Sequence, residues 1–240
     1  MSADGLTGRV AIVTGALGKL GPVWRAALAG AGAIVVGIDL EDDEGVERAD
    51  VTDQASLERV LKRVAAEQGP PAVLVNNAGI DVPPDADDAA SFVETLEVNI
   101  AGVYNATEVF GGAMRDAGRG SIVNIGSVYA SVAPDPSFYD HFDPPFEKPA
   151  AYGASKAGVV SLTRHYARLW GPYGVRVNAL SPGGVLGGQD REFRRKYSAR
   201  VPLGRMAEPS DLVGPLLFLA SDASSYVTGA ELRVDGGFTA

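Results

Sequence analysis

The chain has no cysteine and only two histidines, His141 and His165, among its 240 residues. The absence of cysteine excludes disulfide bonds, thiolate metal ligands and cysteine nucleophiles. Two histidines also exclude a His-rich metal site, so we expect no metal. Basic residues are also fewer than acidic ones. The chain has 21 Lys and Arg and 30 Asp and Glu, which gives it a formal net charge of −9. An acidic surface repels phosphate backbones and anionic lipid, so we expect neither a nucleic-acid nor a membrane partner.

Long apolar runs are missing too. The segment Met1–Gly8 contains Asp4 and lacks the apolar core of a signal peptide. No stretch reads as a span of roughly 18 apolar residues, which a transmembrane helix needs, and we expect a cytoplasmic protein. The composition, 46% hydrophobic and 21% charged, is that of an ordinary globular protein. No segment is rich enough in Pro, Gly or Ser to be a linker, which predicts one domain over residues 1–240.

Short apolar runs alternate with segments of helical periodicity. The expected strands are Val10–Val13, Ala33–Ile38, Ala72–Asn76, Ser121–Ile125, Val175–Ala179 and Glu231–Val234. The expected helices are Lys19–Ala29, Leu57–Glu67, Phe92–Met114, Tyr152–Trp170 and Leu212–Leu219. The strands are apolar on both faces, as a parallel sheet covered by helices on both sides requires. The order predicts an α/β fold, a Rossmann-like, doubly wound parallel β-sheet in a three-layer α/β/α sandwich.

Two segments interrupt this alternation. Val132–Pro149 contains five prolines among acidic and aromatic residues, and Ser181–Gly204 opens with Pro182-Gly183-Gly184. Long loops in a compact domain are commonly lids or binding loops. We therefore predict a cofactor half over about residues 1–125, a substrate loop over about 128–150 and a lid over about 184–208.

A glycine-rich turn, Thr14–Gly21, follows the first expected strand directly and precedes the first helix. Glycines let a backbone turn tightly and approach a pyrophosphate, and the helix N-terminus offers free N–H groups. Asp39 ends the second strand, where an acid accepts hydrogen bonds from the ribose hydroxyls of a bound dinucleotide. Asp39 would repel a 2′-phosphate, and no Lys or Arg follows it before Arg48. The pattern predicts NAD as the cofactor rather than NADP.

Tyr152 and Lys156 are four residues apart in an expected helix, so their side chains share one face. A phenol titrates near pH ~10 and needs help to act as a base at neutral pH. A cation one turn away and the positive nicotinamide of an oxidised cofactor would favour the phenolate. The pair is common by chance, and its interpretation depends on the residues around it.

These motifs, in order and along essentially the whole chain, resemble the single-domain short-chain dehydrogenase/reductase family. Each motif alone is weak, but the set in register is specific. The matching residues are Thr14–Gly21, Asp50-Val51, Asn76–Gly79, Asn99, Ser127, Tyr152, Lys156, Pro182-Gly183 and Asp235–Gly237.

The resemblance implies a role for each catalytic residue. Tyr152 would be the general base in alcohol oxidation and the general acid in ketone reduction. Lys156 would lower the pKa of Tyr152 and hold the nicotinamide ribose. Ser127 would polarise the substrate oxygen, and Asn99 would hold a water that links Lys156 to solvent.

Cofactor and substrate sets follow from the same motifs. The expected cofactor residues are Gly15, Leu17, Gly18, Leu20, Gly21, Asp39, Leu40, Asp50, Val51, Asn77, Ala78, Gly79, Tyr152, Lys156, Pro182, Gly183 and Val185. The expected substrate residues are Ser127, Tyr129, Tyr139, His141 and Gly184.

The sequence departs from the family pattern at three places. Lys19 occupies the sixth position of the turn, where the family more often has glycine, and the Gly-x-x-Gly-x-x-Gly spacing resembles the longer sugar-nucleotide epimerases and dehydratases. Gly187 stands where a threonine often binds the carboxamide, so backbone groups near Val185 would do that work. Ser127 and Tyr152 are 25 positions apart, further than usual, because the proline-rich segment lies between them.

Two interpretations of the irregular segments stay open. Aromatic and acidic residues of the insertion, such as Phe138 and Asp140, suit a polyhydroxylated substrate, but the loop could equally pack only on its own protein or on its oligomer partner. The basic cluster at 191–200 could meet an anionic substrate group or form the solvated face of a lid helix.

We expect an NAD-dependent oxidoreductase that interconverts a secondary alcohol and a ketone, or a hemiacetal and a lactone. A sugar, polyol or related polar small molecule is the leading substrate. The alternatives are a reductase of an apolar ketone or 3-oxoacyl thioester, an epimerase or dehydratase that uses NAD transiently, and a non-catalytic NAD-binding regulatory subunit. The family resemblance also implies a homotetramer or homodimer.

Overall fold

Seven strands form one parallel sheet in the order β3-β2-β1-β4-β5-β6-β7 in the computed structural model, which describes residues 5–83 and 88–240. The strands are β1 (Val10–Thr14), β2 (Ile34–Asp39), β3 (Val46–Arg48), β4 (Pro71–Asn76), β5 (Gly120–Ile125), β6 (Val175–Pro182) and β7 (Glu231–Val234). The order reverses at β1, which pairs with β2 on one side and β4 on the other. Such a switch point opens a crevice at the carboxyl ends of the strands.

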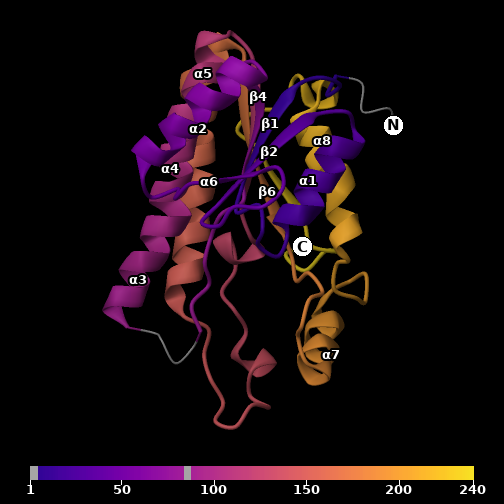
Figure 1. The fold of residues 1–240 in the computed structure, drawn as a ribbon. Coiled ribbons are helices and arrows are strands. Elements are labelled where there is room, and N and C mark those ends of the chain that lie inside the picture. The colour runs from indigo at the N-terminus through magenta and orange to yellow at the C-terminus, as the bar shows by residue number, and fades with distance from the viewer. Residues whose placement is uncertain (1–4, 84–87) are drawn as a thin grey trace.

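Helices cover both faces of the sheet, as Figure 1 shows, with α1 and α8 on one side and α2, α4 and α6 on the other. The helices are α1 (Gly21–Gly30), α2 (Gln54–Glu67), α3 (Ala89–Leu96), α4 (Gly102–Ala106), α5 (Gly112–Asp116), α6 (Ala150–Trp170), α7 (Arg191–Arg200) and α8 (Val213–Ala220). Two π-helical segments, η2 (Glu97–Ala101) and η3 (Thr107–Gly111), join α3, α4 and α5 end to end. Short 3₁₀ turns are η4 (Val128–Ala130), η5 (Pro136–Phe138), η6 (Gly171–Tyr173), η7 (Pro209–Leu212) and η8 (Asp222–Ser224). The doubly wound prediction is confirmed.

The strands divide their side chains between two cores because successive residues of a strand point to opposite faces. On β1, Val10 and Ile12 join the core beneath α2 and α6, whereas Ala11 and Val13 join the core beneath α1 and α8. All four are at most 3% exposed. This two-sided burial explains why the strands read as continuous apolar runs.

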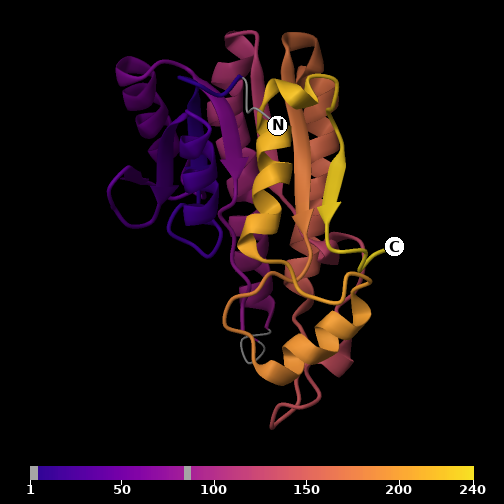
Figure 2. The same ribbon diagram turned by 90° about the vertical axis from the view of Figure 1, so that its right-hand side faces the viewer.

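The structure adds three features that periodicity did not predict. Strand β3 (Val46–Arg48) has only three residues and pairs with β2 at the sheet edge. The expected helix Phe92–Met114 extends from Ala89 to Asp116 but contains the two π-helical segments. The lid carries the regular helix α7. Figure 2 shows α7 crossing below the sheet, next to the loop of residues 131–149.

Within the described ranges, 5–83 and 88–240, no helix combines the length and apolar character that a membrane span requires.

A buried chain of hydrogen bonds ties the central strands to α6. Asn76 Nδ2 donates to Asn124 Oδ1 (2.8 Å), and Asn124 Nδ2 donates to Thr163 Oγ1 (2.9 Å). The three residues are at most 2% exposed. Because buried amides without partners are costly, this chain fixes α6 against the ends of β4 and β5.

We expect Asn124→Ala to lower the free energy of unfolding by about 1–3 kcal/mol, because it removes two buried hydrogen bonds. Asn76 then keeps only its bond to Thr107, and Thr163 only its bond to Val159. Chemical denaturation measures this. The double variant Asn76→Ala/Asn124→Ala should lose less than the sum of the two single variants; additive losses would show that the two amides act independently.

Candidate active site

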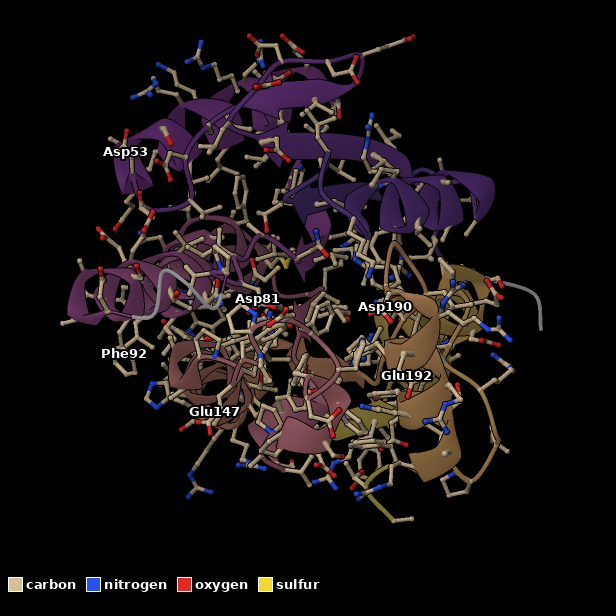
Figure 3. The ribbon with its side chains drawn as sticks, turned by 90° about the horizontal axis from the view of Figure 1, so that it is seen from below. Asp53, Asp81, Phe92, Glu147, Asp190 and Glu192 are labelled. Carbon is tan, nitrogen blue, oxygen red and sulfur yellow. The ribbon has the colours of Figure 1, made fainter. Side chains whose placement is uncertain are left out.

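The loops that leave the carboxyl ends of β1, β4, β5 and β6 meet at one end of the sheet. This is the lower end in Figure 1, where the loop of residues 131–149 and α7 project beyond the strands. Figure 3 looks onto this end, and the labelled Asp81 and Asp190 lie on opposite sides of its centre. Most of the predicted catalytic and cofactor residues come from these loops and from the helices that follow them, and Asp39, Leu40, Asp50 and Val51 come from the ends of β2 and β3.

The glycine turn after β1 is packed too closely for side chains at two positions. Gly15 has φ +62°, and a Cβ on it would lie 2.7 Å from Ala78 Cα. A Cβ on Gly21 would lie 2.3 Å from Gly15 O. Thr14 Oγ1 accepts hydrogen bonds from the backbone N–H groups of Asn77 and Ala78, both at 3.1 Å. The turn is thus held against the loop after β4, leaving its outer side open to a ligand.

Asn77 supports this turn with its side chain. Its Nδ2 donates to Thr14 O and Gly15 O, and its Oδ1 accepts from Trp24 Nε1 at 2.8 Å. Every polar atom of the Asn77 side chain therefore has a partner within the protein. A direct side-chain contact with a cofactor is not needed to explain this residue.

Asp39 lies at the end of β2 and bonds both neighbouring loops. Its Oδ2 accepts from Leu17 N and its Oδ1 accepts from Leu40 N, each at 2.8 Å. Each oxygen keeps a lone pair for another donor. The carboxylate is partly exposed and faces the crevice.

A cleft of about 680 Å³ runs from this carboxylate toward the loop after β4. Nine of the seventeen predicted cofactor residues line it. The other eight do not: Leu20, Gly21, Asn77, Tyr152, Lys156, Pro182, Gly183 and Val185. Five carboxylate residues line it and none of the lining residues is Lys or Arg. The cleft is lined by Gly15, Leu17, Gly18, Ile38, Asp39, Leu40, Glu41, Ala49, Asp50, Val51, Thr52, Ala78, Gly79, Ile80, Glu94, Glu97 and Val98.

The predicted Tyr–Lys pair lies at the N-terminal end of α6. Lys156 is 6% exposed, and its Nζ donates to Ile125 O at 2.8 Å and lies 5.6 Å from the centre of the Tyr152 ring. Tyr129 packs edge-on against Tyr152 with ring centres 6.5 Å apart. Ser127, at the end of β5, is buried and lines the same cavity as Tyr152. The structure thus brings Ser127, Tyr152 and Lys156 together.

Asn99 lies in the π-helical segment η2, which turns its side chain toward the loop after β4. Its Oδ1 accepts from Ile80 N (2.7 Å), and its Nδ2 donates to Ile80 O and Ser155 Oγ, both at 2.9 Å. Asn99 therefore fixes the loop beside Lys156. Its predicted part in a water relay stays a prediction.

Burial shifts the pKa of both members of the pair. Desolvation raises the pKa of Tyr152 to about 12, assisted by the negative charge of Asp81 and opposed by the Ser127 hydroxyl. Desolvation lowers the pKa of Lys156 to about 8. The protein alone thus holds a neutral phenol, and further positive charge close to the ring would be needed to favour the phenolate.

A second cavity, of about 450 Å³, opens in front of Tyr152. Four of the predicted substrate residues, Ser127, Tyr129, Tyr139 and Gly184, line it. The fifth, His141, does not: its Nε2 lies 3.0 Å from Asp190 Oδ1. The cavity is lined by Asp81, Ser127, Val128, Tyr129, Tyr139, Phe142, Lys148, Tyr152, Gly183, Gly184, Gly188, Gln189, Asp190, Phe193, Tyr197 and Met206.

The insertion and α7 are fastened to each other by ion pairs, which we call the clasp. Lys196 pairs with Asp140, and Arg200 Nη2 pairs with Asp135 Oδ2 at 2.5 Å. The basic cluster of α7 therefore does not line the cavity, and neither do these two carboxylates. Of the two interpretations left open for this cluster, these contacts favour a role in packing the lid helix on the insertion over contact with an anionic substrate group.

Aromatic rings form the inner layer of the clasp. Phe138 is 1% exposed, and its ring centre lies 5.4 Å from that of Tyr197 and 5.9 Å from that of Phe193. Tyr197 also stacks on Phe238 from the C-terminal segment, with ring centres 4.8 Å apart, and its Oη accepts from Gly184 N at 2.6 Å. The insertion packs on its own protein and also forms a cavity wall, so it does more than cover a surface. Its fit to a polyhydroxylated substrate stays a prediction.

Three charged cavity residues, Asp81, Lys148 and Asp190, were not among the predicted site residues. Lys148, in the insertion, forms an ion pair with Asp81, and its Nζ lies 5.6 Å from the centre of the Tyr152 ring. Asp81 lies two positions after the Asn77-Ala78-Gly79 motif, and this closeness to a motif at the sheet end could have indicated that Asp81 belongs to the site. No sequence pattern indicates Lys148.

The comparisons with known proteins agree with this geometry. A family profile described as "Enoyl-(Acyl carrier protein) reductase" matches residues 27–239. The chain is 37% identical to a cis-4-hydroxycyclohexanecarboxylate dehydrogenase of Sinomonas cyclohexanicum, covering 97% of each chain. It is also 37% identical to a galactitol 2-dehydrogenase (L-tagatose-forming) of Cereibacter sphaeroides, covering 98% of this chain and 96% of that one.

A solved structure gives the same result for the fold. The short chain dehydrogenase of Leptospira borgpetersenii with bound NAD⁺ superposes with a TM-score of 0.90 at 32% identity, covering 99% of this chain and 95% of that one.

The buried ammonium of Lys156 makes stability depend on pH. Because the folded pKa, about 8, is below the ordinary value of 10.5, the protein should gain stability as pH rises between these values and change little below them. We expect Lys156→Met, which removes the buried charge, to unfold at a higher temperature than wild type near neutral pH, with the difference shrinking in alkali. Thermal melts across the alkaline range measure this. The exposed Lys62→Met is the control, and equal pH profiles for wild type and Lys156→Met would contradict the assignment.

Proposed function

The chain belongs to the short-chain dehydrogenase/reductase family, and on that premise we propose that it is an NAD-dependent dehydrogenase that oxidises a secondary hydroxyl group of a neutral polyol or sugar. Its named relatives are dehydrogenases of CH–OH groups. The observation that carries the proposal is the position of Tyr152 and Ser127 in the wall of the substrate cavity, with the Lys156 ammonium directly behind them.

The crevice fits a dinucleotide. Its glycine turn approaches the neighbouring loop too closely for side chains, as Gly15 and Gly21 show. Lys156 lies at the boundary between the cleft and the cavity, because a Cβ on Gly79 of the cleft wall would be 3.6 Å from Lys156 Nζ. When bound, the oxidised nicotinamide would supply the hydride acceptor.

The chain's own residues then handle the proton. Ser127 and Tyr152 hydrogen-bond the substrate hydroxyl and hold its carbon at the cleft boundary. Tyr152 Oη accepts the hydroxyl proton as hydride leaves the carbon, and the Lys156 ammonium stabilises the phenolate that precedes this transfer. The buried position of the pair keeps bulk water away from the reacting atoms.

The charges in the cavity favour a substrate without charge. One ammonium, Lys148, faces two carboxylates, Asp81 and Asp190, and Lys148 is already paired with Asp81. Backbone N–H groups of Phe193 and Glu192 lower the pKa of Asp190 and keep it charged. Carboxylates accept hydrogen bonds from hydroxyl groups, and the rings of Tyr129 and Tyr139 offer flat apolar faces.

A hydroxy acid is the second candidate substrate. The Lys148 ammonium lies next to Tyr152, where a carboxylate could exchange for Asp81 as its partner. A relative that acts on a hydroxycyclohexanecarboxylate is compatible with this option.

The test is a panel of polyols, sugars and hydroxy acids with NAD, read as NADH formation. We expect the highest kcat/KM with a neutral polyol or sugar. Tyr152→Phe should lower kcat by at least about 100-fold, because general acid–base catalysis contributes on that order, and should still bind NAD. Tyr166→Phe on the same helix, whose hydroxyl bonds Glu108 instead, is the matched control. A Tyr152→Phe enzyme as fast as wild type would remove the proposed role.

Asp39 should set the preference for NAD. Asp39→Asn removes the charge that would repel a 2′-phosphate, and we expect the ratio of kcat/KM for NAD to that for NADP to fall by about tenfold or more, as for a lost charge-assisted contact. Glu44→Gln, in the exposed loop beyond β2, removes the same charge and should leave the ratio unchanged. A wild-type preference for NADP would refute the assignment.

A further inference from the structure

Two of the sequence departures meet in space. Lys19 stands in the cofactor turn where the family more often has glycine, and Gly187 stands in the lid loop where it often has threonine. Lys19 Nζ donates to Val185 O at 3.2 Å. A Cβ on Gly187 would lie 2.5 Å from Lys19 Cε and 2.9 Å from its Nζ. The lysine side chain therefore occupies the space that a side chain at position 187 would need.

The Lys19 ammonium carries a charge that the described residues do not neutralise. Ion pairs are formed by other Lys and Arg side chains in the described ranges, but none involves Lys19. Its protein partner is a neutral carbonyl, which Gln189 Nε2 also contacts at 2.9 Å. Desolvation lowers the pKa of Lys19, as expected for an ammonium that is partly removed from water without an anionic partner.

The position of Lys19 matches the requirement of a dinucleotide. It lies one residue before Leu20, which caps α1 without a side-chain hydrogen bond. Pro22 in the first turn has no N–H, so the helix start offers an anion fewer donors than usual and a nearby cation matters more. The adjoining cleft is lined by five carboxylates and by no Lys or Arg, so a diphosphate entering it meets repulsion. A cation at the turn would offset that repulsion.

We propose that Lys19 is a cofactor-binding residue whose ammonium contacts the diphosphate of NAD and, through Val185 O, fastens the lid loop over it. This inference rests on the proposed dinucleotide binding. It also explains together the two differences from the family pattern, at positions 19 and 187, because only a glycine at 187 leaves room for the side chain of Lys19. The Val185 carbonyl already accepts hydrogen bonds from Lys19 and Gln189, and the carboxamide contact expected from backbone groups near Val185 stays a prediction.

Ligand binding without turnover tests the proposal. We expect Lys19→Gln to raise the calorimetric Kd for NAD and for ADP-ribose by about tenfold, as for one lost charge-assisted contact, and to leave the Kd for adenosine unchanged. The wild-type affinity should also weaken more steeply with NaCl than that of Lys19→Gln. Lys62→Gln, which removes the same charge from an exposed helix position, should match wild type.

A double-variant cycle tests the shared space. Gly187→Thr alone should weaken NAD binding, because its side chain collides with Lys19. In the Lys19→Gly background, where that collision is absent, the same substitution should cause no further loss of NAD affinity. Thermal melts confirm that each variant is folded.

The outcomes separate this inference from the proposed function. Normal NAD binding by wild type with an unchanged Kd for Lys19→Gln, or purely additive effects in the cycle, would overturn the role of Lys19 alone. A folded wild type that binds neither NAD nor NADP would overturn the proposed function, and the inference with it.

Discussion

The site depends on a lysine ammonium held inside the protein one helical turn from a phenol. Lys156 is almost fully buried, and the carbonyl of Ile125 at the end of β5 accepts its hydrogen bond. A buried charge is unfavourable unless it is well bonded, so α6 must lie close against β5. The Asn124–Thr163 bond further along the same strand and helix holds them together. These buried hydrogen bonds between β5 and α6 therefore position Lys156 and Tyr152 for the proposed chemistry.

Charge is distributed unevenly over the two halves of the crevice. In the adenosine-side cleft, all the charged residues among the described lining residues are carboxylates, such as Asp39 and Asp50. The cavity in front of Tyr152 instead contains the Asp81–Lys148 ion pair. A chain with a net charge of −9 therefore depends on a few well-placed cations to receive an anionic ligand. A single lysine beside the crevice therefore has a large effect on the affinity for an anionic ligand.

The fold was predictable because each central strand is long enough to show its pattern. Four aliphatic residues in a row, Ala72–Val75 in β4, leave little ambiguity, whereas the three residues of β3 show no period. The π-helical segment that carries Asn99 keeps the periodicity of a helix and so was not visible. The order of the motifs located Ser127, Tyr152 and Lys156, since each follows a recognisable strand or begins a helix.

The cavity wall was less predictable, because the contacts that form it cross long stretches of chain. Lys196 and Asp140 are 56 residues apart, and nothing in the local sequence of either pairs them. Charges that looked available for a ligand are consumed by this contact. Conversely, Lys148 stands alone among prolines and aromatic residues and gives no local sign that it reaches Tyr152.

The clasp has a consequence for how this protein can acquire new substrates. All of its elements follow β5 in the chain, whereas the glycine turn and Asp39 precede it. Chimeras that receive only the insertion from a homologue would pair foreign charges with the native α7 and leave aromatic rings mismatched. Transplanting the insertion, α7 and the C-terminal segment as one cassette would preserve their mutual fit and leave the dinucleotide half intact. A redesign of this cavity wall therefore requires matched changes in three separate stretches of sequence.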